Sequence, residues 1–342
     1  MKINLNIAVI GAGRIGKIHI ENLTFRIPET QVVAVADADP DIAAKAAEQF
    51  NIPTAVSDYK EILSSAEIDA VIVCSPTNTH AQIVQQAAAA GKHIFCEKPI
   101  DLSLENINKT LEAVETAAVK FMVGFNRRFD PNFQKVHEIV TTGKIGKPYV
   151  LRITSRDPAP PPAEYIKVSG GIFLDMAIHD FDMARYLINS EIKEIYTKGN
   201  VLVDPVFKKY NDLDTAVTTL TFENGTIGTI DNCRQAVYGY DQRVEVFGAD
   251  GMVTVTNNTP DNHILIDRNG SHRALPLNFF MDRYVESYYR EMLAFIDCIK
   301  NDSAPPITGN DGKLAVVLGL AAILSDKEKR AVAIEEIILL PN

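Results

Sequence analysis

The segment HIFCEKPI, residues 93–100, ends a short apolar run on an acid, a base and a proline. Charged side chains are rarely buried without a partner or a task, so a buried strand that finishes on Glu97 and Lys98 is unusual. An amine in this position could bind an alcohol oxygen or relay its proton. The alternative interpretation is a structural ion pair at the end of the strand.

A second set of candidates lies in SGGIFLDMAIHDFDMARYLI, residues 169–188. Asp175 and His179 are four residues apart in a helical pattern, so they share one face of the helix. The carboxylate can then orient the imidazole and fix its protonation, although such pairs are also common structural contacts. Asp180 and Asp182 point to other faces and no HExxH motif occurs, so we expect no metal ion.

The sequence GAGRIG is a G-x-G-x-x-G turn that follows a predicted strand and opens a predicted helix. Gly11 allows the tight turn, Gly13 lets the backbone approach a pyrophosphate, and Gly16 permits close packing of helix on strand. Arg14 and Ile15 complete the loop. We therefore expect this loop to bind a dinucleotide.

Asp37 ends the second apolar run, about twenty residues further on, where a carboxylate accepts hydrogen bonds from the ribose 2′-hydroxyl of NAD. The next residues, Ala38 and Asp39, supply no cation for a 2′-phosphate. A phosphate beside Asp37 would also meet like charge. The sequence therefore favours NAD over NADP.

These residues must be positioned by the elements around them. The first 125 residues alternate five apolar runs with amphipathic helical segments, which predicts a doubly wound parallel sheet covered on both faces. In such sheets ligands bind beyond the carboxyl ends of the strands, where Lys98 stands. We assign residues 1–125 to an NAD-binding Rossmann domain.

The pattern changes after Phe125. We expect a helix over 132–142, a strand in KPYVLRITSRD, a proline-rich loop in DPAPPPAEY, and helices near 282–300 and 312–327. Between them lie runs of period two with Asn-Gly and Asp-Gly turns, which are strong hairpin signals. Residues 126–342 are therefore predicted to form an α/β domain with a mainly antiparallel sheet, for substrate binding and oligomerisation.

Composition excludes several classes of protein. The formal net charge of −10 and the absence of a basic run argue against a nucleic-acid partner. No apolar stretch of about 18 residues predicts a membrane helix, and the N-terminus lacks a signal peptide, so a cytoplasmic protein is expected. The four cysteines have no zinc-site spacing and are expected to be free, buried thiols.

Taken together, AVIGAGRIG, VADAD, VCSPTNTH, CEKPI and GGIFLDMAIHDFDMARYL resemble the glucose–fructose oxidoreductase and inositol dehydrogenase family over essentially the whole chain. The segments RDPAPPPAEYIKVSGG and DNCRQAVYGYDQRVEVFGADG look most like the inositol 2-dehydrogenase branch. The resemblance implies a Rossmann domain followed by an α/β domain whose open sheet mediates homotetramers. It also implies NAD-dependent oxidation of myo-inositol to scyllo-inosose.

The resemblance also implies roles for individual residues. His179 would be the general acid/base, Asp175 would orient it, and Lys98 would bind the reacting oxygen and relay the proton. The bond between Lys98 and Pro99 would often be cis in such proteins. The nicotinamide half of the cofactor would be lined by Ser75, Thr77, Asn78, His80 and Glu97.

The polyol ring needs many hydrogen bonds, because unpaired hydroxyls are costly. Asn126, Arg127, Asp157 and, more weakly, Tyr240 are candidates to supply them. Alternatives remain open at this stage. They are another cyclic polyol or sugar, such as scyllo-inositol, a glucose-like sugar or an amino sugar, a redox-assisted glycosidase that uses NAD, and a non-catalytic NAD-sensing regulator.

Overall fold

The computed structural model describes residues 4–339. The chain packs as two compact units. Of the described residues, the first unit contains 4–129 together with Glu286–Leu314, and the second contains Asp130–Val285 and 315–339. The predicted domains, 1–125 for NAD binding and 126–342 for substrate binding and oligomerisation, stay a prediction.

The first unit is built on a six-stranded parallel sheet with strand order β3-β2-β1-β4-β5-β6. This order is that of a dinucleotide-binding fold. The central strands are short runs of apolar residues, fully buried because helices cover both faces. The strands are β1 Leu5–Ile10, β2 Thr30–Ala36, β3 Thr54–Val56, β4 Ala70–Val73, β5 His93–Glu97 and β6 Phe121–Gly124.

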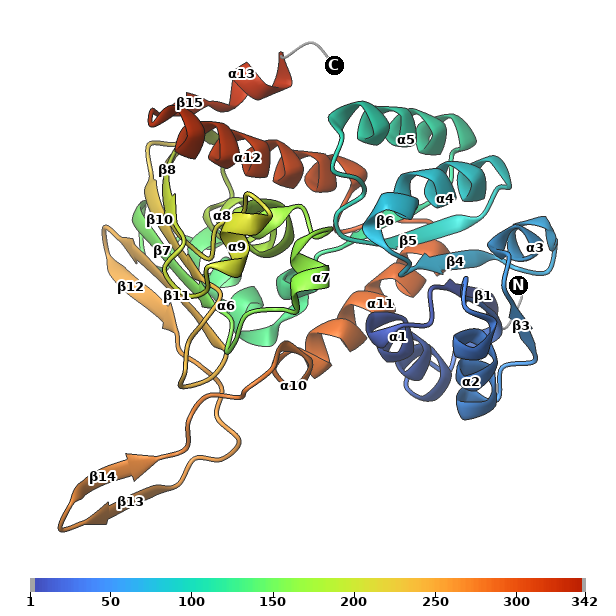
Figure 1. Cartoon of the computed structure of the whole chain (residues 1–342), viewed down its shortest axis with the longest axis horizontal. Coiled ribbons are helices and arrows are strands. Elements are labelled where there is room, and N and C mark those ends of the chain that lie inside the picture. Colours follow the sequence, from blue (N-terminus) through green and yellow to red (C-terminus); the bar gives the residue numbers. More distant parts are fainter. Residues whose placement is uncertain (1–3, 340–342) are drawn as a thin grey trace. The chain divides into compact units, whose positions relative to one another are not determined.

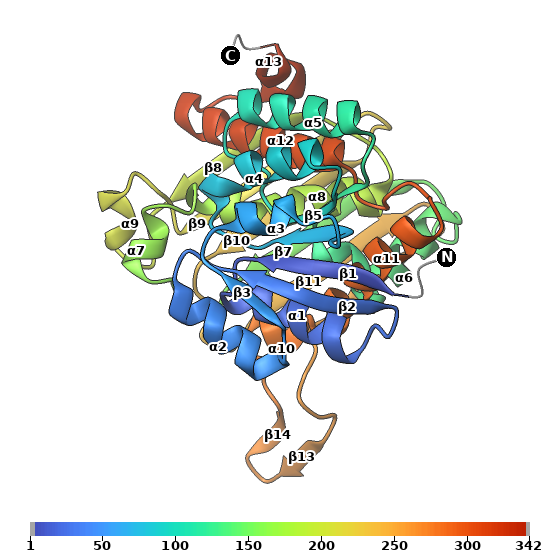
Figure 2. The same ribbon diagram turned by 90° about the vertical axis from the view of Figure 1, so that its right-hand side faces the viewer.

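Figures 1 and 2 show α1 and α2 on one face of this sheet and α4 and α5 on the other. Several helices begin at residues suited to the position. Asp39 accepts a hydrogen bond from the N–H of Asp41, and Pro40 occupies the first turn of α2. The helices are α1 Arg14–Phe25, α2 Pro40–Phe50, α3 Tyr59–Ser64, α4 Thr77–Ala89, α5 Leu104–Ala117 and α11 Val285–Lys300, with the 3-10 turn η1 Asn126–Phe129.

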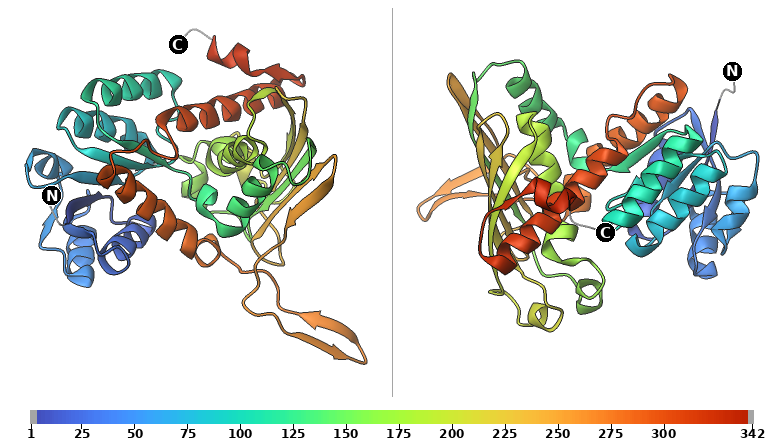
Figure 3. Two further views of the ribbon diagram at one scale, coloured as in Figure 1. Left: turned by 180° about the vertical axis from the view of Figure 1, so that it is seen from behind. Right: turned by 90° about the horizontal axis from the view of Figure 1, so that it is seen from above.

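The second unit is built on a seven-stranded sheet with strand order β12-β11-β7-β10-β9-β8-β15. All its pairs are antiparallel except β7 with β10. The strands are β7 Pro148–Arg156, β8 Ile192–Asn200, β9 Thr215–Phe222, β10 Ile227–Cys233, β11 Asp241–Gly248, β12 Gly251–Val255 and β15 Val332–Ala333. A separate hairpin, β13 Ile264–Asp267 with β14 Gly270–Arg273, extends away from this sheet (Figures 1 and 3).

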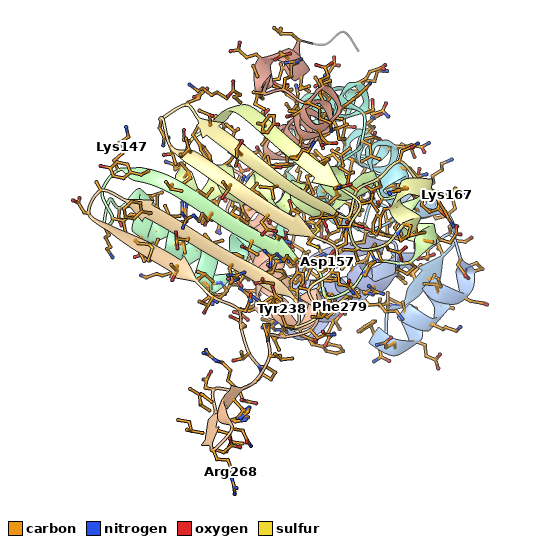
Figure 4. All side chains as sticks on the ribbon, turned by 60° about the vertical axis from the view of Figure 1, so that its left-hand side comes forward. Lys147, Asp157, Lys167, Tyr238, Arg268 and Phe279 are labelled. Atoms are coloured by element: carbon orange, nitrogen blue, oxygen red, sulfur yellow. The ribbon has the colours of Figure 1, made fainter. Side chains whose placement is uncertain are left out.

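Helices cover one face of the seven-stranded sheet, as its nearly edge-on view in Figure 3 (right) shows. Figure 4 looks onto the opposite face, where no helix crosses the strands. The helical elements are α6 Pro131–Thr141, α7 Ala163–Ile166, the π-helix η2 Ile172–Met176, α8 Ala177–Ile188, α9 Val206–Lys209, α10 Phe280–Arg283, α12 Gly309–Glu328 and α13 Ile334–Ile338.

The predicted fold class is confirmed, with three corrections of detail. A sixth strand, β3, joins the first sheet and is too short to show a pattern. The end of the proline-rich segment is helical, because Pro162 is compatible with the start of the one-turn helix α7. Cys96 and Cys298 are buried free thiols, whereas Cys74 and Cys233 are free but partly exposed. Between residues 4 and 339, no helix has the length and apolarity to cross a membrane.

Candidate active site

The glycine turn between β1 and α1 has the close packing that its sequence predicts. A Cβ on Gly11 would lie 2.6 Å from the backbone of Cys74 and Ser75, and Gly11 has a φ of +96°. A Cβ on Gly16 would lie 1.9 Å from the carbonyl oxygen of Gly11. In contrast, a Cβ on Gly13 would have nothing within 4 Å. The turn is therefore closed where helix meets strand and open at Gly13, where a pyrophosphate would approach.

No side chain caps the N-terminus of α1, so its first N–H groups, at the positive end of a twelve-residue helix, are not used by a capping side chain. Arg14 and Ile15 form the first turn of this helix. Beside it, Asp37 Oδ2 accepts a hydrogen bond from the N–H of Ala12 at 2.8 Å, and Oδ1 accepts from the N–H of Asp39 at 3.0 Å. The carboxylate is thereby fixed next to the glycine turn, an arrangement that fits NAD.

The loop after β4 is held by its own polar side chains. Ser75 Oγ and Thr79 Oγ1 lie 2.6 Å apart, and Thr77 and Asn78 begin α4. The ring of His80 is buried, with its nitrogens 2.8 Å from the carbonyl oxygen of Pro99 and 2.7 Å from that of Ser75.

Burial lowers the pKa of His80, so the ring is neutral at pH 7 and donates to one of these carbonyls at a time. The observed contacts of His80 therefore join the loop after β4 to the loop after β5. Its predicted contact with the cofactor stays a prediction, as do those of Ser75, Thr77 and Asn78.

Lys98 is half-buried and follows β5 directly, and the peptide bond between Lys98 and Pro99 is cis, as the resemblance implied. Its neighbour Glu97 accepts a hydrogen bond from His19 Nε2 at 2.8 Å. Glu291, from α11, completes the group. Each of the three side chains, His19, Glu97 and Glu291, has one nitrogen or carboxyl oxygen that could bind a metal, and these three atoms lie within 4.8 Å of one another.

Glu291 is fully buried, and neither of its carboxyl oxygens has a hydrogen-bond partner. Burial, and secondarily the charge of Glu97, raises the pKa of Glu291 well above its usual value. The side chain is therefore the neutral acid over an extended pH range. No sequence motif indicates a role for His19 or Glu291, because their proximity to Glu97 depends on the packing of α1 and α11 against β5.

Asn126 and Arg127 lie in the 3-10 turn directly after β6, at the same edge of the sheet as Lys98. Both side chains are buried. Buried polar groups normally have a structural or binding task. Their roles in substrate binding remain predictions.

In the second unit, Asp175 and His179 lie where a π-helix passes into α8. The residue before the π-helix is Gly171, whose φ is +81°. Asp212 Oδ1 accepts a hydrogen bond from the N–H of Ile172 at 2.9 Å and so fixes this start. Short π-helices occur frequently at functional sites. The predicted orientation of His179 by Asp175 stays a prediction.

Asp175 is held through both of its carboxylate oxygens. Tyr165 donates its hydroxyl proton to Oδ1 at 2.7 Å, and Arg234 Nη2 donates to Oδ2 at 2.8 Å. Tyr165 is 47% exposed, but desolvation of its hydroxyl and the adjacent charge of Asp175 raise its pKa, so the phenol is protonated and donates at neutral pH. Burial also raises the pKa of Asp212, which lies near the same carboxylate.

Asp157 follows β7 at the end of the sheet (Figure 4) and accepts a hydrogen bond from Arg234 Nη1 at 3.1 Å. Tyr240 is buried, and its ring packs edge-on against Tyr284. The candidates Asp157 and Asp175 are thus joined by one arginine that the sequence analysis did not select. In the sequence, Arg234 is only a single arginine after a run of alternating polar and apolar residues. That pattern is too common to mark a functional residue.

The metal site weighed for Asp175, His179, Asp180 and Asp182 gains no support. Asp180 is fully buried and accepts a hydrogen bond from Asn232 at 2.8 Å, within the core of the second unit. In residues 4–339, the cluster with metal-ligand spacing is the one formed by His19, Glu97 and Glu291. Its imidazole nitrogen and carboxylate oxygens could bind a divalent cation. The same cluster could instead hold a proton on one of its acids.

Two family models match this chain. The model described as oxidoreductase family, NAD-binding Rossmann fold matches residues 5–125. The model described as GFO/IDH/MocA C-terminal domain matches residues 133–254. The chain is 49% identical to a myo-inositol 2-dehydrogenase from Thermotoga maritima, over 98% of this chain and 100% of the relative.

Solved structures are similar over nearly the full length. A scyllo-inositol dehydrogenase from Lactobacillus casei with bound NAD(H) and scyllo-inositol is 30% identical, with a TM-score of 0.91 over 97% of this chain and 99% of the other. A myo-inositol dehydrogenase from the same organism, in complex with NAD(H) and myo-inositol, is 29% identical, with a TM-score of 0.86 over 96% of both chains.

Proposed function

The chain belongs to the GFO/IDH/MocA oxidoreductase family, and from this premise we propose that it oxidises the 2-hydroxyl of myo-inositol to scyllo-inosose with NAD. The observation that carries the proposal is the 49% identity to a myo-inositol 2-dehydrogenase along the whole length of both chains. The glycine turn with Asp37, and Lys98, Asp175 and His179 in their expected elements, support it.

In this proposal, bound NAD supplies the acceptor for a hydride that leaves the carbinol carbon. Lys98 binds the reacting oxygen and keeps it oriented. His179 accepts the hydroxyl proton as the C–H bond breaks and the carbonyl forms, and Lys98 can relay that proton. Asp175 stabilises the imidazolium that results. Asn126, Arg127, Asp157 and Tyr240 would hold the remaining ring hydroxyls.

A substrate panel tests the proposal. Myo-inositol, scyllo-inositol, glucose and an amino sugar are each incubated with NAD and with NADP, and the reduced cofactor is followed by its absorbance. We expect the highest kcat/KM for myo-inositol with NAD. Turnover of hexoses alone would contradict the substrate, and cleavage of a glycoside without net NADH would indicate the redox-assisted glycosidase instead.

Scyllo-inositol is the second candidate substrate, because a solved relative holds that isomer with NAD(H). The identity to that relative is 30%, against 49% to the Thermotoga maritima enzyme, so the myo isomer is favoured. The ratio of the two kcat/KM values in the same panel decides between them.

We also propose that the chain forms a homotetramer through the uncovered face of its seven-stranded sheet. Large apolar side chains are exposed on β8 to β12, namely Tyr196, Val217, Ile227, Phe247 and Met252. Contiguous exposed apolar area is typical of an interaction surface. The same patch on each copy could meet its counterpart across a two-fold axis, as in most homo-oligomers.

Light scattering after size exclusion tests the assembly. Val217→Lys with Phe247→Lys should lower the mass of the particle, because two charges would be buried in each contact. Leu202→Lys is the matched control, since Leu202 is also exposed but lies outside the strands. A tetramer that persists in the double variant would exclude this face as the interface.

We further propose a cytoplasmic role in inositol catabolism. The free cysteines are compatible with a reducing compartment. Oxidation of a polyol with NAD yields a ketone and a reduced cofactor, as a degradative step does. Cell fractionation followed by the inositol assay would contradict this if the activity appeared outside the cytoplasm.

A further inference from the structure

The segment from Asp157 to Asp175 leaves the seven-stranded sheet and returns as the π-helix. It contains the proline-rich stretch, α7 and Gly170–Gly171. A long excursion with little regular structure is costly to hold in one conformation, and such loops are usually functional. In this chain both ends of the excursion are bound by one side chain, that of Arg234.

The backbone places Arg234 at the base of this loop. β7 and β10 pair in parallel with Cys233 opposite Arg156, so Asp157 and Arg234 are the next residues of adjacent strands. The N–H of Asp157 donates to the carbonyl of Cys233 at 2.9 Å, and the N–H of Arg234 donates to the carbonyl of Asp214 at 2.8 Å. The guanidinium therefore projects from a fixed point.

The ion pairs of Arg234 with Asp157 and Asp175 are largely shielded from water, and we call these three side chains the clamp. The Arg234 side chain is 5% exposed, while the carboxylates of Asp157 and Asp175 are 24% and 11% exposed. Burial alone would lower the pKa of Arg234, but the charges of Asp175 and Asp157 outweigh it and raise the pKa. Asp212 lies near the same cation and adds a third carboxylate. Removing the arginine would leave the acids without their shared counter-charge.

We propose that Arg234 is a positioning residue, which holds the candidate site residues Asp157 and Asp175 of the second unit in place. Its guanidinium holds together the two ends of the loop 157–175 and keeps the carboxylates of Asp157 and Asp175 at fixed points. Tyr165 fixes the second oxygen of Asp175 from the middle of the same loop. This inference rests on the proposed function, since it acts through Asp175 on the proton acceptor and through Asp157 on the polyol.

Lysine cannot replace this arginine fully. A planar guanidinium donates to two carboxylates at once, whereas an ammonium is a point charge on a flexible stem. Arg234→Lys should therefore keep the positive charge beside the two acids but lose the geometry that holds them. Arg234→Gln should lose both. The two variants separate the charge of the clamp from its shape.

The experiment uses the full-length enzyme with NAD and myo-inositol. We expect kcat of Arg234→Gln to fall about 100-fold, the effect of misplacing reacting groups by about 1 Å. The acidic limb of its pH profile should move to higher pH, because two neighbouring carboxylates no longer share a cation. In Arg234→Lys that limb should stay near the wild-type position while kcat is only partly restored. The Kd for NAD should be unchanged in both.

The matched control is Arg185→Gln. Arg185 is also a buried arginine of the second unit, 8% exposed, and it pairs with Glu191 through Nε and Nη2 at 2.6 and 2.8 Å. We expect this variant to keep the wild-type pH profile. A shift of the limb in Arg185→Gln equal to that in Arg234→Gln would show a general loss of packing and would overturn the proposal.

Hydrogen exchange measured by mass spectrometry tests the clamp without any substrate. Peptides from 157–176 should exchange faster in Arg234→Gln than in the wild type and in Arg185→Gln. Unchanged exchange there, or a kcat within threefold of the wild type, would refute the role of Arg234. If the wild type oxidises no inositol while the loop exchange responds as expected, the proposed function fails and the clamp stands.

Discussion

Replacing Glu291 with glutamine should stabilise this protein, and increasingly so as the pH rises. Glu291 is fully buried in α11 beside Glu97 and His19, and its carboxyl oxygens have no hydrogen-bond partner. Burial raises its pKa well above the ordinary value. Glutamine has nearly the same shape but cannot ionise, so the substitution removes the titration and little else.

The sign follows from proton linkage. In the unfolded chain Glu291 ionises near its ordinary pKa, whereas in the folded protein it stays protonated to higher pH. The folded state therefore binds more protons, and its stability falls as pH rises from the ordinary pKa toward the raised one. While the pH lies between the two pKa values, one proton costs about 1.4 kcal/mol per pH unit, or roughly 3 kcal/mol over two such units. Because glutamine does not ionise, the stability of Glu291→Gln should not decrease in this way.

Thermal melts at half-unit steps from pH 5 to pH 8, with EDTA in every buffer, measure the effect. The Tm of Glu291→Gln minus that of the wild type should grow by about 2 °C per pH unit. The control is Glu286→Gln on the same helix. The side chain of Glu286 is 44% exposed, and its hydrogen bonds with Arg290 and Arg26 lower its pKa, so this variant should gain nothing as pH rises.

A difference that stays constant with pH, or a variant less stable than the wild type throughout, would refute the reasoning, since Glu291 would then be ionised and paired. Zinc added in place of EDTA provides a second check. If zinc raises the Tm of the wild type but not of Glu291→Gln, the cluster holds a cation rather than a proton.

The remaining predictions concern the reaction. Lys98→Ala should abolish turnover while NAD still binds, as measured by cofactor fluorescence; near-normal activity would remove its assigned role. His179→Ala should lower kcat by about 10²–10⁴, and a loss below tenfold would exclude it as the acid/base. Asp37→Ser with Ala38→Arg should shift preference toward NADP, because the carboxylate that opposes a 2′-phosphate is removed and a cation is added beside it. An unchanged ratio of kcat/KM for the two cofactors would contradict the assignment of Asp37.

The sequence was sufficient wherever the signal is local. The glycine turn is one such case, because the φ of Gly11 and the contact at Gly16 leave no room for a Cβ. The placement of Asp37 and Lys98 at strand ends is another, since both follow apolar runs that are buried strands in the structure. The hairpins β9–β10 and β11–β12 follow from turn residues between alternating runs.

Periodicity could not show how separate segments pair. The parallel contact of β7 with β10 joins strands far apart in the chain, and consecutive hairpins alone predict antiparallel neighbours. The one-turn helix after Pro162 and the π-helix at Ile172 depend on contacts outside their own residues, such as that of Asp212 with the N–H of Ile172.

By itself, the sequence determined the fold class, the cofactor turn and the family, because spacing, alternation and turn chemistry are properties of neighbouring residues. Only the tertiary structure decided which charges meet. Arg234 reaches Asp157 and Asp175 across separations of 77 and 59 residues, and Glu97 lies 78 residues from His19. Such pairs form because buried charges need partners, and the register of the sheet and the packing of helices select which partner is within reach.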